Sequence, residues 1–143
     1  MPNKKILLFI FSLLWLMPAV SLAGTPQAQV EIYDVAKRKV IHSKPISFIT
    51  QKEAAKYIKG IDDIYVKVNP IPKAGQMIKI PLEPPIAVKN EWMDSLVDEV
   101  IVIFPKGEKP YLMMFDDENQ YHFLQFKGSA DDLLKYLGIH PTQ

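Results

Sequence analysis

Three apolar segments separated by short polar turns constrain the fold of this chain most. They are residues 100–104, 111–115 and 121–126, and the connections between them are six and five residues long. A parallel crossover needs a dozen or more residues, so neighbouring segments must pair in the antiparallel sense. The first segment is mostly β-branched and does not alternate with polar residues, which is typical of a strand buried on both faces. The sequence therefore predicts a three-stranded antiparallel meander.

Two other segments have the start and stop signals of short helices. Thr50 and Glu53 have the spacing of a capping box, and Gly60 has the position of a left-handed residue at a helix end. In the second segment, Ser129 is predicted to cap the helix and Gly138 to end it. Both segments have apolar residues at helical spacing, so each helix is expected to bury one face.

Alternating apolar and polar residues predict additional short strands. These are residues 30–34, 40–43, 64–68 and 77–80. We expect Pro81 to stop the last of them, because proline cannot donate to a sheet. Together the elements predict an α+β domain, with a mostly antiparallel sheet of five to seven strands and two short capped helices packed on it.

The two predicted helices also match each other in sequence. Residues 50–61 and 129–139 share a capping residue, an acidic residue three positions later and a Lys-Tyr pair before the closing glycine. One interpretation is an internal duplication of a ββα-type unit. The other is that any two capped amphipathic helices ending at glycine look alike. Both interpretations predict helices on one face of an antiparallel sheet.

Residues 1–23 have the features of a secretory signal peptide. Lys4 and Lys5 precede an apolar run, and Ala23 is the small residue before the expected cleavage site. The run is too short to cross a bilayer comfortably, since a spanning helix needs about 20 apolar residues. We expect cleavage near Ala23, a single domain of residues 24–143, and a location outside the cell or at the exterior of the envelope, without a stable membrane anchor.

Charge and cysteine content exclude several classes of function. Without the two lysines of the signal, the 17 basic groups become 15 against 16 acidic groups, a formal charge of −1. Such a near-neutral domain is not expected to bind nucleic acid. The chain has no cysteine, which excludes disulfides, thiolate zinc sites and the lipid-modified cysteine of a bacterial lipoprotein. It also has no glycine-rich phosphate loop, and we expect no cofactor.

Candidates for catalytic chemistry are few. The three histidines, His42, His122 and His140, have no second ligand at metal-binding spacing, so no metal site is predicted. Residues 116–119 are acidic but lack the spacing of a calcium loop, and they are predicted to form a hairpin turn. If the protein performs chemistry, His122 is the candidate general base and Asp116 its acidic partner.

A proline-stiffened apolar strip at residues 80–86 is the main candidate for binding. Such a strip is ordered before it docks and loses little entropy on docking. A tryptophan follows at position 92, where it either anchors a partner or packs onto the core. The binding hypothesis therefore assigns contacts to Leu82, Pro84, Pro85, Ile86 and Trp92. The alternative is a stiff loop packed over one sheet face.

Several segments share a pattern with exported proteins of one group of bacteria. They are residues 30–33, 40–42, 57–61, 110–116 and 133–137. In these segments the chain resembles small exported or surface-tethered proteins of spore-forming Gram-positive bacteria that have no assigned function. Members of such groups often carry a lipid-modified cysteine, which this chain lacks. The resemblance thus implies export without implying a tether, and it provides no active-site residue.

From the sequence we expect a secreted or envelope-associated binding domain that performs no chemistry. Its expected partner is a protein of the envelope or the extracellular space, and its expected contact surface is the strip 81–92 with the adjoining sheet edge. Two alternatives stay open. One is a small extracellular hydrolase acting on cell-wall polymer through His122 and Asp116, and the other is a structural coat or matrix component.

Overall fold

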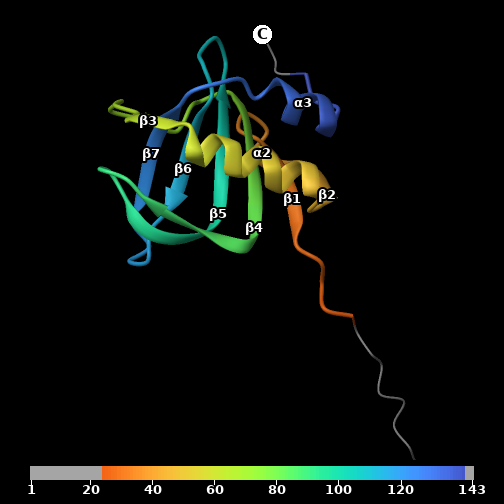
Figure 1. The fold of residues 1–143 in the computed structure, drawn as a ribbon. Coiled ribbons are helices and arrows are strands. Elements are labelled where there is room, and N and C mark those ends of the chain that lie inside the picture. The colour runs from red at the N-terminus through yellow and green to blue at the C-terminus, as the bar shows by residue number, and fades with distance from the viewer. Residues whose placement is uncertain (1–23, 141–143) are drawn as a thin grey trace, which may run out of the picture.

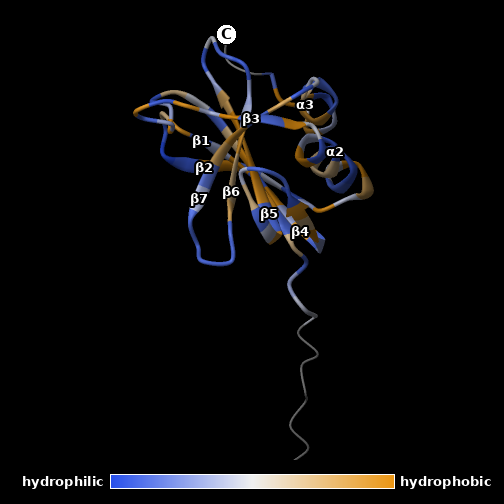
Figure 2. Ribbon diagram, turned by 60° about the vertical axis from the view of Figure 1, so that its left-hand side comes forward, coloured by the Kyte–Doolittle hydropathy of each residue, from blue (hydrophilic) through white to orange (hydrophobic). Residues whose placement is uncertain are grey.

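A computed structural model describes residues 24–140, so the predicted signal peptide 1–23 lies outside the described residues. The described part forms one antiparallel sheet with two helices on the same face (Figures 1 and 2). The elements in chain order are β1 (Gln29–Asp34), β2 (Lys39–Pro45), α2 (Phe48–Lys59), β3 (Ile61–Ile64), β4 (Gly75–Lys89), β5 (Asp94–Pro105), β6 (Tyr111–Phe115), β7 (Tyr121–Phe126) and α3 (Asp131–Leu137). Neither helix has the length and hydropathy needed to cross a bilayer.

The sheet has seven strands in the order β2-β1-β4-β5-β6-β7-β3, and every neighbouring pair is antiparallel. This arrangement confirms the predicted α+β class and the predicted meander, which consists of β5, β6 and β7. Strands from both halves of the chain belong to one continuous sheet. Whether the two halves descend from a duplication stays a prediction.

The core lies between the sheet and the two helices. Side chains of alternate strand residues fill it, as the two-residue period of a strand requires, and helix residues close it from the other side. Its largest fully buried side chains include Ile32, Ile78, Leu112, Tyr57 and Leu133. In the segment 100–104, four of the five residues are buried and Ile101 is half-buried, so the predicted double burial of this strand is largely correct.

Helix α2 begins earlier than the sequence predicted. The N-cap is Ser47, whose hydroxyl accepts from the Thr50 amide at 3.2 Å, while the Thr50 hydroxyl accepts from the Ser47 amide at 2.9 Å. Thr50 therefore occupies the third helical position of a capping box, and the prediction that it is the cap was wrong. The error arose because threonine can fill either position of the box, and Glu53 made the later position look complete.

Gly60 ends α2, but not in the predicted left-handed conformation. Its φ is −85°, which any residue adopts. A glycine fits here because an added Cβ would lie 2.9 Å from the carbonyl oxygen of Lys127, just after β7. The Lys127 amide donates to the Gly60 carbonyl at 2.8 Å, so close approach of two backbones explains this residue.

Helix α3 ends where the sequence predicted, but its N-cap differs from the prediction. Ala130 occupies the N-cap, with no side-chain hydrogen bond to the helix, and the predicted cap Ser129 lies one residue before it. The Ser129 hydroxyl accepts from the Asp131 amide at 3.0 Å, which satisfies one free amide from outside the cap position. Gly138 has a φ of 70°, which confirms the predicted left-handed end.

Two strand predictions near the middle of the chain were wrong. Strand β3 covers Ile61–Ile64, and not residues 64–68, because its pairing with β7 starts directly after α2. Strand β4 does not stop at Pro81 but continues to Lys89. Pairing of β4 with β1 ends at Lys79, so the later part of β4 has β5 as its only neighbour, and its prolines need no donor on the open side.

Candidate functional site

The structure separates the five residues of the predicted binding strip into three environments. Leu82 is 2% exposed and belongs to the core. Ile86 and Trp92 are half-buried and pack against that core. Pro84 and Pro85 are exposed on the outer part of β4. A partner therefore has direct access to the two prolines, and only partial access to Ile86 and Trp92.

Helix α2 holds the bend of β4 in this strip. The register of β4 against β5 shifts between Pro81 and Ile86, and the Glu83–Pro84 peptide bond is cis. The side-chain amide of Gln51 donates to the Pro81 carbonyl at 2.7 Å and accepts from the Glu83 amide at 2.9 Å. The strip is therefore fixed to the helix rather than free as a loop.

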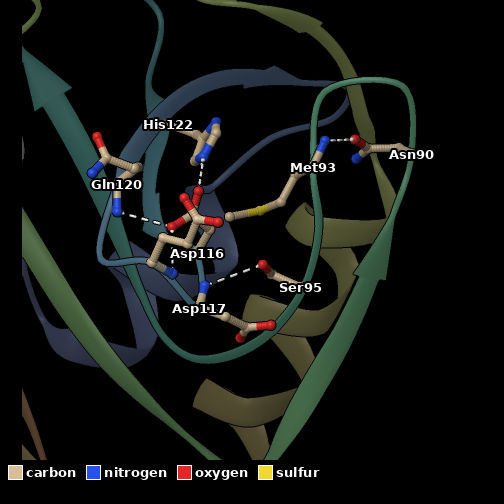
Figure 3. Close-up of polar contacts among 8 residues, drawn as sticks. Asn90, Met93, Ser95, Asp116, Asp117, Gln120 and His122 are labelled. Atoms are coloured by element: carbon tan, nitrogen blue, oxygen red, sulfur yellow. Dashed lines mark hydrogen bonds and ion pairs between the residues drawn. The ribbon is translucent and has the colours of Figure 1, made fainter.

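The structure brings together the two residues that the hydrolase alternative named. His122 Nε2 lies 2.8 Å from Asp116 Oδ2, across the hairpin turn between β6 and β7 (Figure 3). The second carboxylate oxygen of Asp116 accepts from the amides of Glu118 and Gln120, at 2.9 and 2.8 Å. The hydrogen bond from His122, followed by those from the backbone amides, lowers the pKa of Asp116 below its ordinary value.

The surroundings of this pair are those of a hairpin turn. The hydroxyl of Ser95 accepts from the Asp117 amide at 3.2 Å, which connects the β6–β7 turn to the start of β5 (Figure 3). Within residues 24–140, no hydrogen bond joins a serine or threonine hydroxyl to His122. In the same part of the chain, no three His, Asp or Glu side chains are grouped to hold a metal ion. The pair is therefore a histidine and an acid without a positioned nucleophile.

The other two histidines lie apart from this pair. His42 is exposed on the edge strand β2, and His140 is exposed after α3. The acidic residues 116–119 form the predicted turn, with Asn119 in the left-handed region at a φ of 59°. The basic cluster 37–39 lies at the β1–β2 turn.

The face of the sheet opposite the helices carries a row of aromatic side chains (Figure 2 shows the helices on the other side). Strand alternation directs Leu112, Met114 and Leu124 into the core, so the residues that alternate with them point to the face opposite the helices. Five aromatic residues form a continuous chain of ring contacts there, and we call them the aromatic stripe: Phe115, Tyr121, Phe123, Tyr111 and Tyr65.

The edge contacts within the aromatic stripe have the geometry of favourable aromatic pairs. Tyr121 contacts Phe115 and Phe123 edge-on, with ring centroids 6.5 and 5.7 Å apart. Tyr65 stacks on Tyr111 with centroids 3.7 Å apart and planes 9° from parallel. Exposure is uneven along the row, because Tyr111 is 2% exposed whereas Tyr121 is 64% exposed. Tyr121 is thus a large apolar ring that is held by neighbours and open to solvent.

Comparison with known proteins gives no match. Searches against protein-family models, curated proteins and solved structures all find nothing similar to this chain. A proposal about function must therefore be based on the chemistry and shape of the described surface.

A cleft of about 630 Å³ adjoins one end of the aromatic stripe, between the loop after β3 and the β5–β6 turn. Tyr111 donates from its hydroxyl to the Pro70 carbonyl, which holds the loop over the sheet. Glu108 accepts from the Tyr65 hydroxyl at 2.9 Å and forms an ion pair with Lys67. Hydrogen bonding to Glu108 raises the pKa of Lys67, and the pKa of Glu108 is lowered in turn. Both groups thus stay charged at neutral pH.

Sequence reasoning missed the aromatic stripe, although part of its signal was present. In strands β6 and β7, aromatic residues recur at even spacing: Tyr111 and Phe115 are four residues apart in β6, and Tyr121 and Phe123 are two residues apart in β7. That spacing alone would have placed them on one face. Tyr65 joins the row only through tertiary structure, because 46 residues separate it from Tyr111 in the sequence.

Proposed function

We propose that this protein is an exported, non-catalytic binding domain that captures a protein of the cell envelope or the extracellular space through its aromatic stripe. The observation that carries the proposal is the exposed ring of Tyr121, held between Phe115 and Phe123 on a sheet face that no helix covers. Aromatic side chains dominate the energetics of protein interfaces, and tyrosine is among the residues enriched there.

The rigidity of the stripe favours tight contacts. A ring already fixed by its neighbours loses little conformational entropy when a partner covers it, so more of the burial energy appears as affinity. The ion pair of Glu108 and Lys67 adjoins the Tyr65 end of the aromatic stripe and gives the apolar surface a polar rim. Such a combination suits a protein surface better than nucleic acid, whose phosphates require a basic patch.

The test is a cross-linking capture on the envelope of the producing cell, read by mass spectrometry. We expect the native chain to enrich one envelope or extracellular protein, and Tyr121→Ala to abolish most of that enrichment. Phe48→Ala is the matched control, since Phe48 is an aromatic residue 82% exposed on α2, away from the sheet face. Equal capture by the native chain and Tyr121→Ala would contradict the proposal.

The 2.8 Å contact between His122 and Asp116 favours a second candidate, a small hydrolase acting on cell-wall polymer. A histidine held by a carboxylate has a fixed ring orientation, which a general base requires. The test is digestion of isolated wall material by the native chain and by His122→Asn. Release of soluble fragments by the native chain alone would support this candidate, and no release by either protein would remove it.

A further inference from the structure

The outer edge of β3 is open at the end of the sheet. Strand β3 is the last strand in the sheet order and pairs only with β7. One further bond, from the Tyr65 amide to the Phe123 carbonyl at 2.9 Å, extends this pairing past Ile64. Because peptide groups alternate along a strand, those of Ile64 and Val66 face away from β7. The Val66 peptide has no backbone partner among residues 24–140. In this part of the chain, the Ile64 peptide is held only by two exposed side chains, because its amide donates to Asp63 at 2.7 Å and its carbonyl accepts from Gln125 at 3.2 Å. Pairing with another strand displaces both side chains.

The side chains of this edge are apolar and unusually exposed. Ile64, Val66 and Val68 are 42%, 78% and 97% exposed. The pairing reaches Tyr65, so alternation places its two neighbours, Ile64 and Val66, on the same side of the chain. Tyr65 and Lys67, which alternate with them, both contact Glu108 on the other side. An edge with two such β-branched side chains is a template for strand pairing, which natural proteins normally guard.

The sequence of this edge is complementary to itself in one antiparallel register. With a two-fold axis at Tyr65, Ile64 of one copy faces Val66 of the other, and Asp63 faces Lys67. The outward peptide groups of Ile64 and Val66 are then the ones that exchange hydrogen bonds, as the antiparallel ladder requires. The two-fold axis makes each of these contacts occur twice.

We propose that residues 63–67 form an interface between two copies of this chain, in which the end of β3 and the residues directly after it pair and join the two sheets into one. The charge pattern selects this register. A shift of two residues in either direction takes Asp63 away from Lys67 and places each charge opposite an uncharged residue. In the interface, Lys67 lies between Glu108 of its own copy and Asp63 of the other.

Pairing of the two copies also extends the surface of the aromatic stripe. Tyr65 ends the stripe in one copy and lies on the proposed axis, so it faces Tyr65 of the second copy across a non-hydrogen-bonded pair. The two stripes then run as one continuous aromatic surface over both copies. This interface does not depend on the proposed capture function, because it uses the edge rather than the face of the sheet.

Sedimentation velocity over a concentration series tests the interface. We expect the native chain to form dimers below about 1 mM, and Asp63→Lys to weaken the dimer by about tenfold or more, because two like-charged pairs replace two ion pairs. Asp62→Lys is the matched control, since it makes the same charge change one residue away, opposite Val68, and should keep the dimer close to native.

A mixing experiment distinguishes this register from any other contact. The second variant is the double substitution Lys67→Glu with Glu108→Lys. It exchanges the two charges of the ion pair within one copy, so residues 67 and 108 still attract each other. In a dimer of either variant alone, residues 63 and 67 carry like charges across the axis. In a mixed dimer of Asp63→Lys with the double variant, residues 63 and 67 carry unlike charges in both of their contacts. We expect the mixture to dimerise at least about tenfold more tightly than either variant alone. A native chain that stays monomeric to about 1 mM, or a mixture no tighter than its components, would overturn the proposal.

Discussion

Replacement of Leu82 by alanine should destabilise the domain strongly, although Leu82 lies in the strip that the sequence suggested for binding. Its side chain is 2% exposed and belongs to the core cluster. Leu82→Ala removes three buried carbon atoms, which costs about 2.4 kcal/mol of transfer free energy at about 0.8 kcal/mol each. A cavity adds to this cost, so we expect a loss of about 3 kcal/mol in the free energy of unfolding.

Urea unfolding followed by tryptophan fluorescence measures this loss. Trp92 is the one tryptophan among residues 24–140 and is half-buried near the strip, so its emission reports unfolding of this region. With a denaturant slope of about 2 kcal/mol per molar urea, the midpoint should fall by roughly 1.5 M. Pro85→Ala, at an exposed site in the same strip, should change the free energy by less than about 1 kcal/mol. A loss below about 1 kcal/mol for Leu82→Ala would refute its place in the core.

Three other substitutions have effects that the structure specifies. Ser47→Ala should lower the free energy of unfolding by about 1 kcal/mol, since it removes the cap of α2, and a urea midpoint measures this. Gly75→Ala should cost at least about 2 kcal/mol, seen as a lower thermal midpoint, because its φ is 122° and an added Cβ would lie 2.1 Å from the Phe104 carbonyl oxygen. Asp116 has a lowered pKa in the folded state, so its contribution to stability is complete above pH 3.8 and is lost as the pH falls through the folded pKa. Urea midpoints of the native chain and Asp116→Asn should therefore differ at pH 6 and approach each other as the pH falls below 3.8; a difference that stays constant would exclude this linkage.

Local signals predicted most of the fold, and the largest strand error has a tertiary cause. Short connections dictated the β5–β6–β7 meander, and the glycine at 138 dictated the end of α3. The predicted strand ended at Pro81 because proline cannot donate to a neighbouring strand. Beyond Lys79, however, β4 has a partner on one side only, so a proline can lie in it. Which side of a strand is open depends on the order of strands in the sheet, and that order is a tertiary property that no local pattern contains.

The candidate site shows the same division between local and tertiary information. His122 and Asp116 are six residues apart across a tight turn, so their contact could be anticipated from the sequence as a pair. The aromatic stripe required the register of β6 against β7 and the return of Tyr65 to the sheet after β3. Leu82, by contrast, lies in the same apolar, proline-rich strip as the exposed Pro84 and Pro85, so the sequence does not distinguish their burial. Only the packing of α2 over β4 makes Leu82 a core residue.

The proposed capture surface and the proposed dimer edge share Tyr65 but can be separated by the residues at their far ends. Tyr121 lies in the aromatic stripe, away from the edge, whereas Asp63 lies on the edge. If the dimer increases capture by presenting two stripes to one envelope, Asp63→Lys should weaken capture through lost avidity and leave the affinity of a single copy unchanged. Tyr121→Ala should lower that single-copy affinity and leave self-association at its native strength. A lower single-copy affinity in Asp63→Lys, or weaker self-association in Tyr121→Ala, would mean that the two surfaces act as one, because an independent edge and face cannot be coupled by a substitution that touches only one of them.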